Sequence, residues 1–173
     1  MNLKNYIRDV PDFPKPGIIF KDISPLLKSP EALTYTIDKL AEPFSKNKID
    51  AIAGVEARGF LLSSPLALKL NKPMILIRKI GKLPHKTLKI SYDLEYGKDT
   101  LEIHQDSIIP GSKVLIVDDL LATGGTINAC INLINKAQGV VIGVSLIIEL
   151  LQLSGRNVIS KSQTNNIHSI IKY

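Results

Sequence analysis

Cysteine and tryptophan are nearly missing from this chain of 173 residues, which has one cysteine and no tryptophan. A single cysteine, Cys130, excludes an intrachain disulfide and favours a reducing compartment. Because Cys130 lies within a helical pattern, we expect it to be a small packing residue rather than a nucleophile.

No hydrophobic run is long enough to cross a membrane. The longest apolar stretch, residues 139–148, ends at Glu149, whereas a membrane-spanning helix needs about 20 apolar residues. Residues 1–9 also lack the apolar core of a signal peptide. We therefore expect a cytoplasmic protein with no membrane partner.

Aromatic residues make up only 5% of the chain, although its net charge is +6. A basic protein can bind nucleic acid or a polyphosphate. Its clustered cations are not interleaved with the aromatic side chains that a base-stacking surface requires, so we expect no nucleic-acid partner. We favour a phosphate site, and the alternative is a solvated charged loop. The clustered cations are Arg78, Lys79, Lys82, Lys86 and Lys89.

Strand patterns alternate with helix patterns along most of the chain. The hydrophobic fraction of 45% and the charged fraction of 22% are typical of one soluble domain. The alternation predicts an α/β fold, with a mostly parallel sheet covered by helices on both faces. Pro43 is expected to kink or end the first helix. The predicted strands are 51–55, 74–78, 114–117, 140–148 and 167–172, and the predicted helices are 31–46, 60–70 and 126–137.

Two segments depart from this alternation within a single domain spanning residues 1–173. The stretch 6–27 is rich in proline and would be ordered only if packed on something, so we expect residues 1–27 to form a hood over the carboxyl edge of the sheet. Residues 79–104 alternate polar and apolar side chains around turn residues, which predicts a mobile β-hairpin region.

The most informative segment is Val114–Thr126. A buried strand is followed by Asp118 and Asp119 at its carboxyl end, where open α/β sheets place their ligands. Residues 122–126 then supply small side chains, glycines and hydroxyls, and a helix begins near Gly125, so backbone N–H groups can surround a phosphate. The segment is neither a Walker loop nor a dinucleotide fingerprint. The alternative is a tight turn with solvated aspartates.

This segment resembles the ribosyl-donor signature of the type I phosphoribosyltransferase family, and within it the adenine phosphoribosyltransferases. Further motifs carry the same resemblance over nearly the whole chain; they are residues 12–27, 54–60, 77–84 and 91–97. The resemblance implies transfer of the phosphoribosyl group from 5-phosphoribosyl-1-pyrophosphate to adenine, giving AMP and pyrophosphate in purine salvage. It also implies Mg²⁺ as cofactor, held mainly through substrate oxygens and water with no direct protein ligand.

The resemblance assigns each candidate site residue a role. Asp118 and Asp119 would accept hydrogen bonds from the ribose hydroxyls. A loop would hold the 5′-phosphate through Ala122, Thr123, Gly124, Gly125 and Thr126. Pyrophosphate would bind a short loop with a strained peptide between Glu56 and Ala57, together with the cations Arg58, Arg78, Lys79 and Lys82. Arg78 would reach the neighbouring subunit of a homodimer.

The base and the catalytic loop are assigned in the same way. Phe20 would cover the purine ring, while Ile19 and Lys21 would read its edge through their main chain. Lys21 departs from the arginine that the family commonly has. Glu95, beside Tyr96 on the mobile loop, is the candidate for proton handling at the purine, and Arg58 would share in catalysis.

Three alternatives stay open at this point. The first is a sister enzyme for hypoxanthine, guanine, xanthine or orotate. The second is a regulator that binds the ribosyl donor and controls transcription or RNA, for which there is no room for a winged-helix domain before the first helix. The third is a relative with lost activity, against which the intact acidic pair and phosphate loop argue.

Overall fold

The computed structural model describes residues 1–93, 98–159, 164 and 166–173. These residues form two compact units, Met1–Lys39 and Leu40–Tyr173. Among them, no helix combines the length and the apolar character that crossing a bilayer requires.

The first unit is built around a short hairpin. Strand β1 (Arg8–Pro11) pairs antiparallel with β2 (Ile19–Asp22). The hairpin loop is held by Asp12, whose Oδ1 accepts a hydrogen bond from the Gly17 amide at 2.7 Å. A 3-10 helix η1 (Leu3–Tyr6) precedes the hairpin, and α1 (Ser24–Lys28) and most of α2 (Pro30–Ala41) follow it. The proline-rich segment is therefore partly regular structure.

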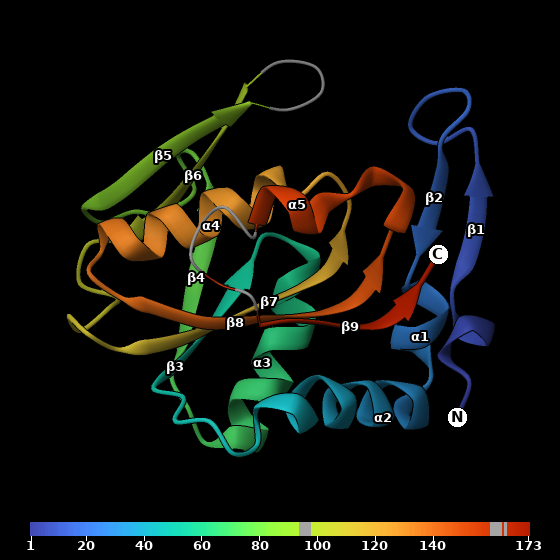
Figure 1. The fold of residues 1–173 in the computed structure, drawn as a ribbon, viewed down its shortest axis with the longest axis horizontal. Helices are drawn as coiled ribbons and strands as arrows, with labels where there is room; N and C mark the ends of the chain where they lie inside the picture. Colours follow the sequence, from blue (N-terminus) through green and yellow to red (C-terminus); the bar gives the residue numbers. More distant parts are fainter. Residues whose placement is uncertain (94–97, 160–163, 165) are drawn as a thin grey trace. The chain divides into compact units, whose positions relative to one another are not determined.

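The second unit is a seven-stranded sheet with the order β5-β6-β4-β3-β7-β8-β9 (Figure 1). The five strands from β4 to β9 in this order are parallel, whereas β6 runs antiparallel to β4 and β5 runs antiparallel to β6. The mostly parallel sheet predicted from the sequence is confirmed. The bounds are β3 (Ala51–Val55), β4 (Met74–Lys79), β5 (Thr87–Asp93), β6 (Lys98–His104), β7 (Lys113–Leu121), β8 (Val140–Glu149) and β9 (Ile167–Lys172).

Helices cover both faces of this sheet. Helix α3 (Arg58–Leu70) lies on one face, and α4 (Gly125–Lys136) and α5 (Gly155–Ile159) lie on the other (Figure 1). Helix α3 can approach β7 closely because residue 59 is a glycine. A Cβ at Gly59 would come within 2.8 Å of the Val117 carbonyl oxygen. The start of α3 is thereby held against the carboxyl end of β7.

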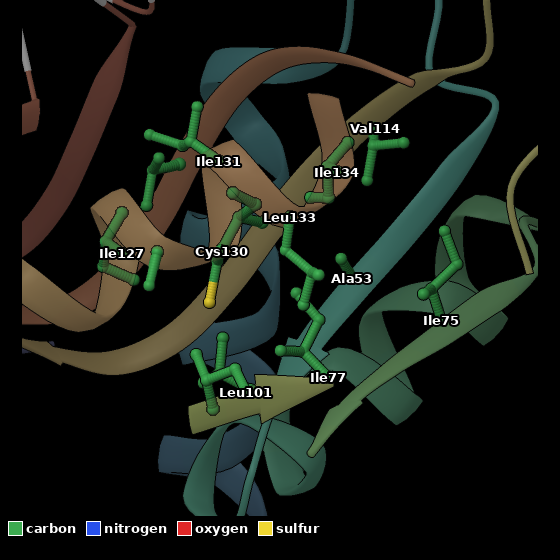
Figure 2. Close-up of a cluster of buried hydrophobic side chains, with 14 of the residues drawn as sticks. Ala53, Ile75, Ile77, Leu101, Val114, Ile127, Cys130, Ile131, Leu133 and Ile134 are labelled. Carbon is green, nitrogen blue, oxygen red and sulfur yellow. The ribbon is translucent and has the colours of Figure 1, made fainter. Parts of the chain in front are cut away.

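The main core lies between the sheet and α4 (Figure 2). Helix α4 turns Ile127, Cys130, Ile131 and Ile134 towards the sheet at spacings of three and four residues. The Cys130 thiol is fully buried in this cluster, as a packing residue should be. The core fixes α4, and with it the loop that precedes the helix.

Some boundaries differ from those predicted. The helix expected over 31–46 ends at Ala41, and Pro43 lies in the 3-10 helix η2 (Glu42–Phe44), because proline lacks the N–H that a longer helix needs. Strand β7 runs on to Leu121, since its pairing with β8 continues to Leu121 and Glu149. Helix α5 follows a third 3-10 segment, η3 (Leu151–Leu153), and was not predicted.

Candidate active site

A cavity of about 220 Å³ lies at the carboxyl ends of β3 and β7, against the first turns of α3 and α4. This is the edge at which parallel α/β sheets bind ligands. The structure brings together here the residues predicted for the ribose and the 5′-phosphate, and part of those predicted for pyrophosphate. The lining residues are Glu56, Ala57, Arg58, Asp118, Asp119, Leu120, Leu121, Ala122, Thr123, Gly124, Gly125, Thr126 and Ile127.

Two adjacent carboxylates and one guanidinium form the polar part of the cavity. The Asp119 side chain is buried, and its Oδ2 lies 3.1 Å from Nε of Arg58. Asp118 accepts the Asp119 amide at 2.9 Å on its Oδ1. Burial raises the pKa of both carboxyl groups, and the negative charge of Asp119 raises that of Asp118 further, while Arg58 lowers both pKa values. A ligand that donates hydrogen bonds to these oxygens would stabilise the charged pair.

The loop from Ala122 to Thr126 passes into α4 through Gly124. Gly124 has φ 86°, a left-handed conformation that glycine adopts without strain, and it caps the helix with no side-chain hydrogen bond. A Cβ at Gly124 would collide with the carbonyl oxygen of Gly155 at the start of α5. The loop is therefore packed closely from behind, and the helix N-terminus carries the partial positive charge that suits an anion.

The other side of the cavity is the loop after β3. The peptide bond between Glu56 and Ala57 is cis. Glu56 accepts both Nε and Nη2 of Arg78, at 3.1 and 3.2 Å, and the Lys79 amide at 2.9 Å. Burial raises the pKa of Glu56, but the hydrogen bonds from Arg78 and Lys79 outweigh it and hold that pKa below its ordinary value. Glu56 is thus an anion that ties β4 to the cavity loop.

The three remaining predicted cations lie beside the cavity rather than in its lining. Arg78 also donates to the Lys82 carbonyl at 3.0 Å and stacks on the Phe60 ring at 6.0 Å. Lys79 Nζ lies 3.3 Å from Oδ2 of Asp99, and the Lys82 side chain is exposed. Arg78 and Lys79 are connected to the cavity through their hydrogen bonds to Glu56, and Lys82 is connected through the bond of its carbonyl oxygen to Arg78.

The residues predicted for the base lie in the first unit. Ile19, Phe20 and Lys21 lie consecutively on β2. The Phe20 ring makes an edge contact with Phe13 at 5.2 Å between centroids, and Lys21 Nζ binds Asp9 at 2.7 Å. Their role at the base stays a prediction.

Glu95 and Tyr96 lie outside the described residues. The hairpin that leads to them is described, and it is tied to α4. Tyr92 on β5 shares a hydrogen bond of 3.4 Å with Thr126 in the phosphate loop, and Lys136 Nζ donates to the Lys89 carbonyl at 3.0 Å. Within the described ranges, no group of three or more His, Cys, Asp or Glu side chains could hold a metal ion.

Sequence reasoning missed three residues that support the site. Tyr92 contacts Thr126 in the loop 122–126, Gly155 packs behind this loop, and the buried carboxylate of Glu102 binds the turn that carries Lys82. Only Glu102 gave a signal, as an acid between the apolar residues Leu101 and Ile103 of a predicted hairpin strand.

The fold and the cavity define a protein class. An acidic pair at a strand end, followed by a glycine loop at a helix start, suits a sugar that carries a phosphate. The family described as "Phosphoribosyl transferase domain" matches residues 23–170. The chain thus has a phosphoribosyltransferase domain.

Individual relatives narrow this class. An adenine phosphoribosyltransferase of Halothermothrix orenii is 57% identical over 156 residues, covering 90% of this chain and 92% of the relative. The crystal structure of adenine phosphoribosyltransferase from Thermoanaerobacter pseudethanolicus superposes with a TM-score of 0.94 at 48% identity, covering 99% of this chain and 98% of that one. The structure of the Saccharomyces cerevisiae enzyme, complexed with an imino-altritol bisphosphate and adenine, has a TM-score of 0.90 at 36% identity, with coverage of 98% and 96%. The chain belongs to the adenine phosphoribosyltransferase family.

Proposed function

We propose that this cavity is where the chain transfers the 5-phosphoribosyl group from 5-phosphoribosyl-1-pyrophosphate to adenine, releasing AMP and pyrophosphate in purine salvage. One observation carries the assignment of the cavity: the acidic pair Asp118–Asp119 and the loop 122–126 line a single space at the sheet's carboxyl edge. The transfer itself is the activity of the family to which the chain belongs.

The ribosyl donor is held at two points. The 5′-phosphate accepts hydrogen bonds from backbone N–H groups of residues 122–126 and lies at the positive end of α4. The 2′ and 3′ hydroxyls donate to Asp118 and Asp119, which offer acceptor oxygens only. These two contacts place the anomeric carbon towards Arg58 and the loop after β3.

The leaving group develops negative charge as the anomeric C–O bond breaks. Arg58 and the loop Glu56–Ala57 bind pyrophosphate, and Arg78, Lys79 and Lys82 supply further positive charge. Arg58 presents planar, permanently charged donors that suit phosphate oxygens. Interactions that strengthen with the developing charge lower the barrier of the transfer step.

The base is recognised through β2. Phe20 covers the purine face, and the main chain of Ile19 and Lys21 reads the amino-purine edge. The Lys21 amine already binds Asp9, which favours recognition through its main chain. A ring nitrogen of adenine attacks the anomeric carbon, and its proton passes to Glu95 on the loop that also carries Tyr96.

Mg²⁺ is the proposed cofactor. The site fits this assignment, because the carboxylates of Asp118 and Asp119 line the cavity proposed for the ribosyl donor and can accept hydrogen bonds from water bound to such an ion. Such an ion binds mainly through substrate oxygens and water, with no direct protein ligand. When bound, it neutralises charge on the pyrophosphate.

We further propose a cytoplasmic homodimer in which Arg78 reaches the neighbouring site. Arg78 lies on the face of β4 that also carries the exposed Leu76, with the exposed Ile80 just beyond the strand's end. Helix α3 adds Leu61 and Leu68, which are 49% and 82% exposed. Exposed apolar side chains of this size are candidates for pairing with a second copy. Reaching across would require Arg78 to exchange its bonds to Glu56 for bonds to pyrophosphate.

The test is pyrophosphate release from 5-phosphoribosyl-1-pyrophosphate and Mg²⁺, with adenine, hypoxanthine, guanine, xanthine and orotate offered separately. Release with adenine alone is expected. Release only with another base would refute the assignment of Ile19, Phe20 and Lys21. Binding of the donor with no release for any base would favour the regulator, which salt-dependent retention on a DNA column would then support.

A further inference from the structure

Glu102 on β6 is a buried carboxylate that the proposed mechanism does not use. Glu102 is 1% exposed, and its neighbours in the strand, Leu101 and Ile103, belong to the apolar core. Burying a carboxylate costs free energy unless hydrogen bonds and charges compensate for the lost water. The compensating groups therefore show what this side chain does.

The partners of Glu102 come from the turn between β4 and β5 and from the start of β5. Its Oε1 accepts the amides of Lys82 and Leu83, both at 3.1 Å. Its Oε2 accepts the Thr87 hydroxyl at 3.3 Å and lies 3.6 Å from Lys89 Nζ. Two successive N–H groups on one oxygen fix the orientation of the turn at the point where the Lys82 side chain leaves it.

The Lys82 main chain is held from a second direction by Arg78. The amide of Lys82 donates to Glu102, and its carbonyl oxygen accepts Nη1 of Arg78 at 3.0 Å. Arg78 also binds Glu56 with its other two nitrogens. A continuous set of bonds thus runs from the buried Glu102 to the cavity loop through Lys82, Arg78 and Glu56.

The protonation state of Glu102 suits this role. Burial raises its pKa, but the amides of Leu83 and Lys82, the Thr87 hydroxyl and the charge of Lys89 outweigh burial and hold the pKa below its ordinary value. Glu102 is therefore ionised at neutral pH, and an ionised carboxylate makes stronger hydrogen bonds to N–H groups than a neutral acceptor does.

We propose that Glu102 is a positioning residue for pyrophosphate, which acts by fixing the turn that presents Lys82 and by keeping Lys82 bonded to Arg78. This inference rests on the proposed function, because that proposal assigns Arg78 and Lys82 to the leaving group. A loop that is held in place spends less free energy on ordering when the anion binds. The Lys82 side chain stays exposed while its backbone is anchored.

The experiment compares Glu102→Ala with Glu102→Gln in the full chain. Calorimetry gives the affinity for magnesium pyrophosphate and, separately, for ribose 5-phosphate, which occupies only the Asp118–Asp119 side of the cavity. Glu102→Ala should weaken pyrophosphate binding about tenfold and leave ribose 5-phosphate within about twofold. Glu102→Gln should stay within about threefold for both ligands, because its amide oxygen still accepts the two N–H groups.

A matched control comes from the same strand. The Thr100 hydroxyl shares a hydrogen bond of 2.9 Å with Ser91 across the hairpin, whereas its contact with the turn is made by its carbonyl oxygen, which accepts the Ile80 amide at 3.1 Å and is kept in alanine. Thr100→Ala should leave both affinities unchanged. Hydrogen exchange supplies a readout apart from ligands, since the amides of Lys82 and Leu83 should exchange faster in Glu102→Ala than in the wild type or in Thr100→Ala.

Three results would overturn the role of Glu102: unchanged pyrophosphate affinity in Glu102→Ala, equal loss of both ligands, or a loss in Glu102→Gln as large as in Glu102→Ala. If Glu102→Ala does not fold, Glu102→Asp replaces it, and its shortened carboxylate should weaken pyrophosphate alone by about threefold. Lys82→Ala tests the underlying assignment by itself. Wild-type pyrophosphate affinity in Lys82→Ala would refute the assignment of Lys82 to pyrophosphate, whatever the Glu102 variants show.

Discussion

Arg58 and Asp119 form an ion pair within the cavity, with Nε of Arg58 3.1 Å from Oδ2 of Asp119. That oxygen is buried and receives no hydrogen bond from the described residues. One guanidinium therefore faces two adjacent carboxylates, since Asp118 lies next in the chain. The site keeps a surplus of negative charge and acceptor capacity, which hydroxyl donors of a ribose would satisfy.

The surplus predicts that Asp118→Asn makes the protein more stable and less active. Burial and the charge of Asp119 raise the pKa of Asp118 in the folded chain. A raised carboxyl pKa means that the folded state loses stability as pH rises through that pKa, so the neutral amide removes a penalty present at pH 7. The variant's Tm should exceed the wild type's by about 3 °C at pH 7, which corresponds to about 1 kcal/mol in a chain of this size.

Thermal unfolding from pH 7 down to the ordinary range of an aspartate checks the Asp118→Asn prediction. The gain in Tm of Asp118→Asn over the wild type should shrink as the wild-type Asp118 carboxyl becomes protonated. Affinity for ribose 5-phosphate should fall about tenfold at the same time, because an amide nitrogen cannot accept a hydrogen bond from the sugar. An unchanged Tm at pH 7 would contradict the charge surplus, and unchanged affinity would contradict the ribose contact.

Gly124→Ala should distort the loop 122–126, because the new Cβ would make a steric clash and the backbone would be strained. Its left-handed φ alone costs about 1 kcal/mol for alanine, and the new Cβ would strike the Gly155 carbonyl oxygen. Gly111 offers a matched control, since it has φ 81° with open space around its Cβ position. Both variants should lower Tm, but only Gly124→Ala should lose affinity for ribose 5-phosphate; equal affinities would show that the close packing of Gly124 does not shape the loop.

The sheet could be predicted from sequence because buried parallel strands have long apolar runs. Strand β3 is buried throughout and has the bounds 51–55 that its apolar run predicts, and the half-buried edge strand β9 has the predicted bounds 167–172. Strand β7 exceeds its apolar run because its end is fixed by pairing with β8 rather than by its own side chains. Helix α5 is five residues long, which is too short for a helical period to be recognised.

The site could be predicted in part for the same kind of reason. The cavity gathers residues of two short segments, 56–58 and 118–127. The acidic pair and the glycine loop indicate a ligand site by their own residue types, whereas 56–58 was assigned through the family resemblance. The role of Glu102 depends on a turn about twenty residues earlier in the chain, at Lys82 and Leu83. Nothing in the alternation of β6 identifies that partner, since only pairing of β4, β5 and β6 brings it close.

The ion pair between Glu149 and Arg156 should make the free energy of unfolding depend on pH in the acid range. Glu149 is buried, and Arg156 binds it with two nitrogens while Ser169 donates a third hydrogen bond. The hydrogen bonds of Arg156 hold the pKa of Glu149 below its ordinary value despite its burial. Because the folded pKa is depressed, the stabilisation is present above the ordinary pKa of a glutamate and is lost as pH falls through the folded value.

Arg156→Leu tests this pair, because it leaves a buried carboxylate without its cation. The free energy of unfolding at pH 7 should fall by about 3 kcal/mol, and the loss should shrink as pH is lowered and Glu149 becomes protonated. Urea unfolding at pH 7 and at acid pH measures both values. The double variant Arg156→Leu with Glu149→Gln should recover part of the loss, and a loss that does not depend on pH would refute the electrostatic explanation.

Mixed dimers should show whether Arg78 serves its own site or that of the neighbouring subunit. Arg78→Ala and Asp119→Asn should each be nearly inactive alone. If Arg78 acts across the dimer, each mixed dimer contains one complete site, formed by Asp119 of the first subunit and Arg78 of the second. Random exchange of subunits should then restore about a quarter of wild-type pyrophosphate release, since half of the dimers are mixed and each has one of two sites intact.

If Arg78 acts only where it binds Glu56 of its own chain, mixing should restore nothing, because every site would lack one of the two residues. The two variants are first diluted separately below the concentration at which the dimer dissociates, and they are then mixed and concentrated above it. Comparison with the unmixed variants separates exchange of subunits from the effect of dilution.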